Sequence, residues 1–136
     1  MDLRARLMRL LQEEAELNEI VQLVGMDALS APDRLKLEAS RSIREDFLHQ
    51  DAFHEVDTYT PLQKQFTMMQ LVLDYYDKAV EALDQGASIE DLVKLPVREQ
   101  IGRFKYVQEK NIQAEYEAVL KALSKQIDEL LQKEDF

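Results

Sequence analysis

Apolar residues recur along this chain at three- and four-residue spacing, and the few glycines and prolines stand where that spacing breaks. The 136 residues include only three glycines and three prolines. This spacing gives a helix one apolar face, whereas a half-buried strand needs strict alternation, which no segment shows. The sequence therefore predicts an all-α fold, a helical bundle of about five to six helices in a single domain over residues 1–136.

Two helices are predicted at the start of the chain, over residues 2–24 and about 31–49. Gly25 stops the first by taking a left-handed backbone conformation. Ser30 and Asp33 form a start similar to a capping box, with Pro32 in the first turn, where its missing N–H costs nothing. The predicted apolar stripes are Leu7, Leu10, Leu11, Leu17, Ile20, Val21 and Val24 in the first helix, and Leu35, Ala39, Ile43, Phe47 and Leu48 in the second.

Residues 50–59 break the pattern and are predicted to be an irregular connection. A third helix restarts at residues 60–63 and stops at Gly86, a short fourth begins at Ser88, and a fifth begins at Pro96. A long amphipathic helix follows from about residue 108; with fewer than four clean heptads, it should pack on the domain's own core. The stripes are Phe66, Met69, Leu73, Tyr76, Val80 and Leu83 in the third helix, and Ile112, Tyr116, Val119, Leu120, Leu123, Ile127, Leu130 and Leu131 in the last.

Charge and cysteine content exclude several classes of function. The formal net charge is −10, which opposes nucleic-acid binding, because that affinity comes mainly from Lys and Arg at phosphates. The mixed charge of residues 31–46 likewise argues against a DNA-binding helix-turn-helix. The absence of cysteine excludes disulfides and thiolate sites. No apolar run approaches the roughly 20 residues that span a bilayer, so we expect a cytoplasmic chain without direct membrane insertion.

Catalytic and metal-binding patterns are weak. The three glycines offer no P-loop, whose backbone must wrap phosphates closely. His49 and His54 lie among acidic residues, so a His and carboxylate metal site is conceivable, but their spacing matches no closed motif. An acid–base pair from Glu55 and Asp57 has no better support. We therefore predict no catalytic residue and no metal site.

The basic segment "LPVREQIGRFKY" stands out in an otherwise acidic chain. Arg98, Arg103 and Lys105 could contact an acidic partner. Alternatively, they pair on the helix surface with nearby Glu99 and Glu109. The second interpretation is the one we favour.

The stretch "LQEEAELNEIVQLVGMDALSAPDRLKLEASRSIREDFLHQDAFHEVDTY" resembles the C-terminal helical domain of the catalytic A subunit, or alpha chain, of archaeal and vacuolar-type rotary ATPases. Its most specific part is "SIREDFLHQDAFHEVDTY". The segments "LVLDYYDKAVEAL" and "LVKLPVREQIGRFKY" follow in the order that this family leads one to expect. The resemblance covers residues 13–106, and the last helix is too generic to add to it.

The resemblance implies a piece of a longer subunit whose P-loop nucleotide-binding domain is absent from this chain. The parent enzyme couples ATP synthesis or hydrolysis to rotation of a central stalk and to transmembrane proton or sodium transport. Its cofactors, ATP or ADP with Mg, would bind outside this chain, which should be inactive alone. The implied partners are the B subunits, the central stalk and the other A-subunit domains, at the cytoplasmic face of a membrane. The alternative is a freestanding helical adaptor without enzymatic role.

A more distant resemblance, to the beta subunit of F-type ATP synthases, implies a stalk-contact loop. There a loop spelled DELSEED lies between two helices and faces the rotating stalk. Here "DALSAPD" occupies the matching place after "LVGM". Because exposed ion pairs are worth roughly 0 to 1 kcal/mol each, we expect the shape of this loop to matter more than its charge. The loop comprises Asp27, Ala28, Leu29, Ser30, Ala31, Pro32 and Asp33.

The same relative implies an edge of an adenine pocket. Its aromatic residue after the equivalent of "FLHQ" is matched most nearly here by Phe53, with Ala52 beside it and a one-residue offset. Aromatic faces suit adenine through stacking and apolar contact. The alternative is that Phe53 anchors the irregular connection on the core.

Overall fold

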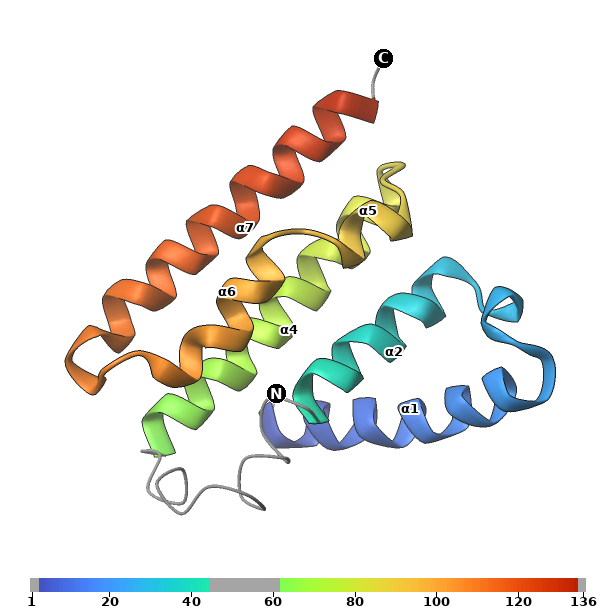
Figure 1. Cartoon of the computed structure of the whole chain (residues 1–136), viewed down its shortest axis with the longest axis horizontal. Coiled ribbons are helices and arrows are strands. Elements are labelled where there is room, and N and C mark those ends of the chain that lie inside the picture. Colours follow the sequence, from blue (N-terminus) through green and yellow to red (C-terminus); the bar gives the residue numbers. More distant parts are fainter. Residues whose placement is uncertain (1–2, 45–61, 135–136) are drawn as a thin grey trace.

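Every regular element that the computed structural model describes, in residues 3–44 and 62–134, is helical. The first range contains α1 (Leu3–Val24) and α2 (Ala31–Ile43), which form a hairpin (Figure 1). The second contains α4 (Leu62–Asp84), α5 (Ile89–Val93), α6 (Val97–Arg103) and α7 (Ile112–Glu134). Short 3₁₀ turns occupy Met26–Ala28 (η1), Phe104–Tyr106 (η4) and Glu109–Asn111 (η5). The predicted all-α fold is confirmed.

The predicted helix boundaries around residues 84–97 are also confirmed, with a physical reason for each. Gly86 has φ 106°, and the bonds from Gly86 N–H to the Leu83 carbonyl and from Ala87 N–H to the Ala82 carbonyl complete a Schellman stop. Ser88 Oγ then accepts from the backbone N–H of Glu90 at 3.2 Å, which caps α5. Pro96 is the N-cap residue of α6, which begins at Val97.

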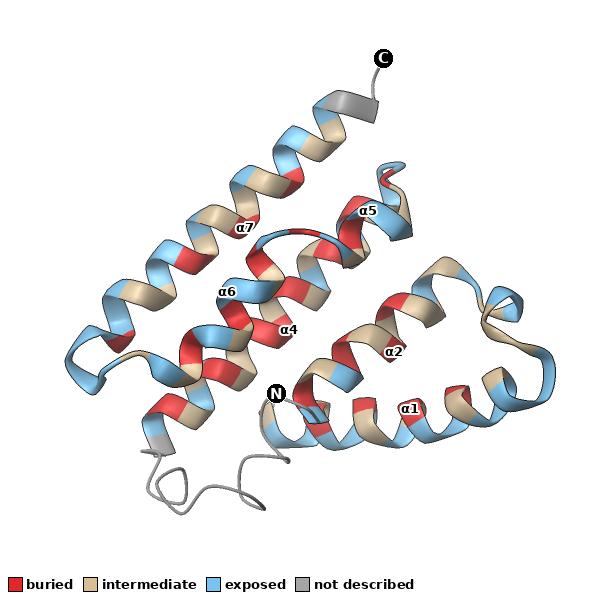
Figure 2. Cartoon of the chain, viewed as in Figure 1, coloured by how far each residue is buried: buried red, intermediate tan, exposed pale blue. Residues whose placement is uncertain are grey.

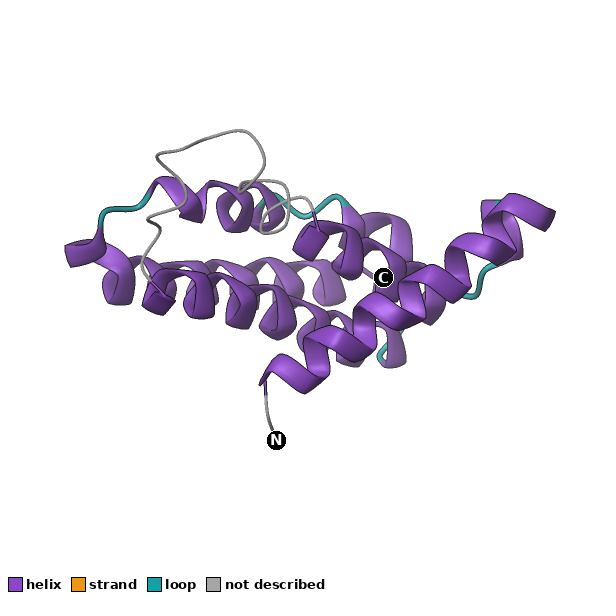
Figure 3. Cartoon of the chain, turned by 90° about the horizontal axis from the view of Figure 1, so that it is seen from below, coloured by secondary structure: helices purple, strands orange, loops and turns teal. Residues whose placement is uncertain are grey.

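Helix α4 is the centre of the molecule. Both α2 and α7 pack against it, and α1 packs on α2. Figure 1 shows α7 alongside α4 and the α1–α2 hairpin on the other side, with α5 and α6 returning over α4. Figure 2 shows the buried residues concentrated on the faces that these helices turn toward one another, and Figure 3 gives the same packing from below. One core therefore runs through both described ranges.

The apolar stripe predicted for α4 is partly wrong. Phe66 is 49% exposed, and the most buried positions include Met68, Val72 and the small residues Ala79 and Ala82. Because α4 is covered by helices on more than one side, its buried face is wider than one stripe of large residues. Small residues at the contact allow close approach of helices, so counting only large side chains misplaced the centre of that face.

The predicted stripe of the last helix is confirmed. Ile112, Val119, Leu123 and Ile127 are buried, and its remaining predicted residues pack against the same core. The packing of α7 on α4, within the chain itself, is the arrangement that the short heptad pattern favoured. None of the described helices combines the length and the apolar run that crossing a membrane requires.

Several predictions lie outside the described residues. The end of the second helix with Phe47, Leu48 and His49, and the irregular connection over residues 50–59, belong to this group. So do His54 and its acidic neighbours. Within residues 3–44 and 62–134, no cluster of three or more His, Asp or Glu side chains is placed to hold a metal ion.

Candidate functional site

The closed end of the α1–α2 hairpin contains the predicted stalk-contact loop. Gly25 ends α1: its N–H donates to the Val21 carbonyl at 2.9 Å, and its φ is 93°. The predicted positive φ is confirmed, but ψ is 164°, which is outside the left-handed helical well. This combination of angles is essentially restricted to glycine. The chain therefore leaves α1 in a direction that another residue would adopt only with strain.

The start of α2 is fixed by the predicted cap. Ser30 has extended backbone angles, and its Oγ accepts from the Asp33 N–H at 3.3 Å. The Arg34 N–H donates to the Ser30 carbonyl at 2.9 Å, and Pro32 lies within the first turn. A cap of this type contributes about 1 kcal/mol. Between Gly25 and Ser30 the η1 turn closes the connection with backbone bonds, from Ala28 to Gly25 and from Leu29 to Met26.

Polar contacts bind the two helices of the hairpin together. Lys36 Nζ lies 3.1 Å from Glu13 Oε2, and this hydrogen bond to Glu13 raises the pKa of Lys36. Ser40 Oγ donates to the Leu10 carbonyl at 3.0 Å. Helices joined by apolar packing and by directional bonds at several turns resist sliding past each other.

The ion pair between Arg44 and Glu14 places a buried carboxylate between the two helices of the hairpin. The Glu14 side chain is only 4% exposed, while the Arg44 side chain is 54% exposed. A buried carboxylate is costly without a cation, so this pair favours one register of α1 against α2.

Apolar side chains are exposed beside the loop, contrary to the sequence prediction. Ile20 and Val24 were predicted to lie in the core stripe of the first helix, yet they are 42% and 66% exposed, and Leu23 is 83% exposed. Figure 1 shows the reason, because the closed end of the hairpin projects away from α4 and α7. Among the described helices, α2 is the one that packs against α1 at this end.

Exposed acidic residues stand close in sequence to the exposed apolar side chains. No Lys or Arg occurs between Arg9 and Arg34. Glu16, Glu19 and Asp27 are exposed. We call the surface formed by Ile20, Leu23, Val24 and the loop residues 27–33 the hairpin tip; its chemistry is an apolar patch with an acidic border.

The loop residues are all described and lie together at the hairpin tip. Asp27 and its neighbour Ala28 are exposed, as are Ser30 and Pro32. The others, Leu29, Ala31 and Asp33, are half-buried. The two aspartates thus lie in different settings. Asp27 lies in the η1 turn, whereas Asp33 lies in the first turn of α2, where a negative charge interacts favourably with the helix dipole.

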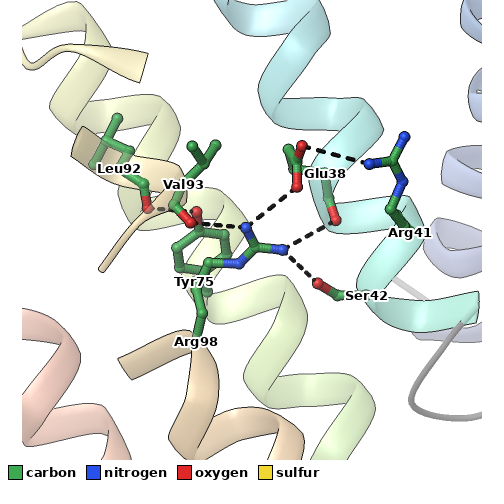
Figure 4. Close-up of polar contacts among 7 residues, drawn as sticks. All are labelled: Glu38, Arg41, Ser42, Tyr75, Leu92, Val93 and Arg98. Atoms are coloured by element: carbon green, nitrogen blue, oxygen red, sulfur yellow. Dashed lines mark hydrogen bonds and ion pairs between the residues drawn. The ribbon is translucent and has the colours of Figure 1, made fainter. Parts of the chain in front are cut away.

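A second polar cluster, centred on Arg98, joins the hairpin to the rest of the fold (Figure 4). Arg98 Nη1 donates to Val93 O at 2.9 Å and lies 3.3 Å from Glu38 Oε2, while its Nη2 donates to Ser42 Oγ at 2.8 Å. The guanidinium carbon lies 5.5 Å from the centre of the Tyr75 ring. Four helices, α2, α4, α5 and α6, contribute to this cluster.

The favoured interpretation of the basic segment is correct for one residue and wrong for another. Arg103 pairs with Glu99 at 3.9 Å, with both side chains more than three-quarters exposed. Arg98 does not pair with Glu99 or Glu109; its acidic partner is Glu38, 60 positions earlier in the chain. Lys105 Nζ lies 5.4 Å from the centre of the Tyr106 ring. Arg98 pairs with Glu38 and not with its neighbours in sequence because it lies on the side of α6 that faces α2.

Sequence reasoning missed both the exposed apolar patch and the Arg98 cluster. The stretch without cations between Arg9 and Arg34 was a visible sign of an unusual surface. For the cluster, Glu38 and Ser42 are four residues apart and so share one helix face, but nothing in the sequence paired that face with Arg98. The predicted adenine-pocket residues, Phe53 and Ala52, lie outside the described residues.

Comparison with known proteins identifies the class to which this fold belongs. Residues 1–93 match the family described as the C-terminal domain of V and A type ATP synthase. The chain belongs to this family.

Individual relatives extend the similarity over nearly the whole chain. The V-type ATP synthase alpha chain of Acetivibrio thermocellus is 57% identical over 132 residues, which is 97% of this chain and 22% of the relative. The alpha chain of Clostridioides difficile is 55% identical over 130 residues, and alpha chain 1 of Clostridium tetani is 52% identical over 132 residues. The similarity thus includes the last helix, and this chain spans about a fifth of the length of these relatives.

Proposed function

We propose that this chain is the force-transmitting end of a catalytic alpha chain, with its hairpin tip in contact with a rotating central stalk. In the whole subunit, ATP synthesis or hydrolysis would occur at the interface with the B subunits. The stalk rotation would in turn be coupled to transmembrane proton or sodium transport. Membership of the ATP synthase family and the names of the relatives support this placement.

Nucleotide chemistry belongs to other parts of that subunit in this proposal. ATP or ADP with Mg would bind in a P-loop domain, and this chain contains no P-loop. Phe53 and Ala52 would border the adenine from this side. The complex would lie on the cytoplasmic side of its membrane as a peripheral assembly.

The observation that carries the proposal is a projecting hairpin whose tip exposes large apolar side chains that no other described helix covers. Its turn is fixed by Gly25 and by the Ser30 cap, and its helices are joined by the Lys36–Glu13 and Arg44–Glu14 ion pairs. Leu23 is 83% exposed and Val24 is 66% exposed, although both side chains are apolar. Exposed apolar groups of this size, bordered by polar residues, mark sites of protein contact.

The chemistry of the tip favours contact through shape and apolar burial rather than through charge. Burying a Leu or Val side chain contributes about 1.5 to 3 kcal/mol. An exposed ion pair contributes about 0 to 1 kcal/mol and is screened by salt. In this proposal the acidic border of the tip orients a basic partner surface, while the apolar residues and the backbone transmit the force.

Three variants of the assembled ATP synthase test the function. Asp27→Ala with Asp33→Ala should leave the ions transported per ATP hydrolysed nearly unchanged. Deletion of Asp27, Ala28 and Leu29 should reduce this ratio severely, and Leu23→Ser with Val24→Ser should also reduce it. The matched control is Met8→Ser, which changes a 60% exposed residue of the same helix far from the tip.

The outcome can contradict the proposal in two ways. If the loop deletion leaves coupling intact, the tip does not transmit force. If the chain does not assemble with B and stalk subunits in cross-linking or size-exclusion experiments, a freestanding adaptor becomes the better interpretation.

A further inference from the structure

Apolar packing restricts the direction in which the hairpin points, but only to a range of angles. Leu35, Ala39 and Ile43 of α2 are buried in the common core with residues of α4. Apolar burial is non-directional and depends mainly on the area removed from water. Packing of side chains sets a preferred crossing angle with some scatter, so directional polar contacts between α2 and its neighbours can hold the hairpin more closely to one angle.

Arg98 supplies directional contacts from α6 to two successive turns of α2. Its guanidinium reaches Ser42 Oγ at 2.8 Å and Glu38 Oε2 at 3.3 Å. These two residues are four apart, so they define a line along the face of α2. A planar guanidinium fork that bonds to two points on this line constrains rotation as well as distance.

The Arg98 guanidinium also bonds to the end of α5. Arg98 Nη1 donates to the carbonyl of Val93, the last residue of α5, at 2.9 Å. Carbonyls in the last turn of a helix have no i+4 partner within it, and for Val93 the Arg98 side chain supplies one. Tyr75 of α4 supports the same end of α5, because its hydroxyl donates to the Leu92 carbonyl at 2.8 Å, while its ring faces the Arg98 guanidinium.

Partial burial makes these contacts stronger than those of an ordinary surface pair. The side chains of Arg98 and Glu38 are 22% and 18% exposed. Water therefore competes with the ion pair less than it does at Arg103 and Glu99, where the side chains are 77% and 79% exposed. Figure 4 shows Arg98 between Glu38 and Ser42 on one side and Val93 on the other.

We propose that Arg98 is a positioning residue that fixes the angle of the α1–α2 hairpin relative to α4, α5 and α6, so that the tip moves as one body with the bundle. The geometric part of this proposal concerns the chain alone. Its mechanical consequence, transfer of movement from bundle to tip, rests on the proposed function.

The geometry can be measured with two spin labels. The chain has no cysteine, so Gln22→Cys on α1 and Lys121→Cys on α7, both exposed positions, give specific labelling. Electron–electron dipolar spectroscopy then gives the distribution of distances between the labels. We expect one narrow distribution for the parent chain and the loss of that single narrow peak in Arg98→Ala.

Further variants separate positioning from folding. Arg98→Lys keeps the charge and the stem but has no fork to bond to α2 and α5 together, so it should also broaden the distribution. The control Arg103→Ala removes an exposed arginine of the same helix and should leave the peak narrow. Circular dichroism of each variant checks that helix content is retained. If Arg98→Ala does not fold, Ser42→Ala, which removes one contact on α2, replaces it and should broaden the peak.

A peak that stays as narrow as the parent's in Arg98→Lys and in the folded Arg98→Ala or Ser42→Ala variant overturns the proposal. This result is independent of any ATPase measurement. The opposite combination is also possible: the Arg98 variants broaden the peak, while the loop deletion leaves ATP-driven transport intact. That combination would support the positioning role of Arg98 and refute the proposed function. The positioning role of Arg98 and the proposed function of the hairpin tip can therefore be refuted independently.

Discussion

Tyr75 shows how one buried hydroxyl couples the stability of this fold to pH. The residue is 2% exposed, and burial raises its pKa from the usual value near 10 to about 12. Between these two values the folded chain keeps the phenolic proton while the unfolded chain loses it. The contribution of this proton to the free energy of unfolding is therefore fully present below pH 10. It falls as the pH rises toward 12, by about 1.4 kcal/mol for each pH unit.

Replacing Tyr75 with Phe should change the alkaline behaviour of the chain. At pH 8 we expect Tyr75→Phe to lose about 1 kcal/mol of unfolding free energy, because the bond to the Leu92 carbonyl is lost. Near pH 11 the difference from the parent should shrink, because only the parent carries the titrating hydroxyl. Urea unfolding at both pH values measures this difference. Tyr106→Phe, at a 76% exposed ring, is the control, and a difference that does not shrink with pH would contradict the argument.

At the scale of single elements, Gly25 decides how α1 ends. Gly25→Ala should lower the unfolding free energy by about 1 to 3 kcal/mol, because φ 93° with ψ 164° strains a residue that has a Cβ. No heavy atom lies within 4 Å of that added Cβ, so the cost is conformational and not a clash. Asparagine tolerates the left-handed helical well, but ψ at residue 25 lies outside that well. Gly25→Asn should therefore lower the unfolding free energy as much as Gly25→Ala does.

Denaturant unfolding of three variants checks the prediction for Gly25. Gln22→Ala, at an exposed position near the end of α1, should stay close to the parent, because Ala is a good helix former. If Gly25→Asn retains the parent's stability, the backbone at residue 25 is not held at φ 93° and ψ 164°.

Most element boundaries were predictable because they depend on residues close in sequence. The Ser30 cap and the Gly86 stop involve partners within five residues, and local spacing encodes such contacts. The exposure of Leu23 and the partner of Arg98 depend instead on which helices cover which faces. Amphipathic periodicity states that a face is apolar, but it does not state that a neighbouring helix ends before covering it.

At the scale of the whole molecule, hairpin and bundle share one core. Leu7 and Leu10 of α1 belong to the same buried cluster as Leu123 and Ile127 of α7. A further link joins α1 to α4, because Arg6 donates to both carboxylate oxygens of Asp77, at 2.7 and 3.2 Å. A hairpin built into the common core should not open independently, which is what the proposed transmission of force requires.

Leu35→Ala tests this unity. Leu35 is fully buried in α2, so its truncation should cost about 2 to 5 kcal/mol of unfolding free energy. Because segments that unfold together lose protection together, the slowest-exchanging amides of α4 and α7 should lose as much protection as those of α2. Native-state hydrogen exchange measures each helix separately. If only α1 and α2 lost protection, the hairpin would be an independent unit, and force at its tip would be absorbed by local opening before it reached α4.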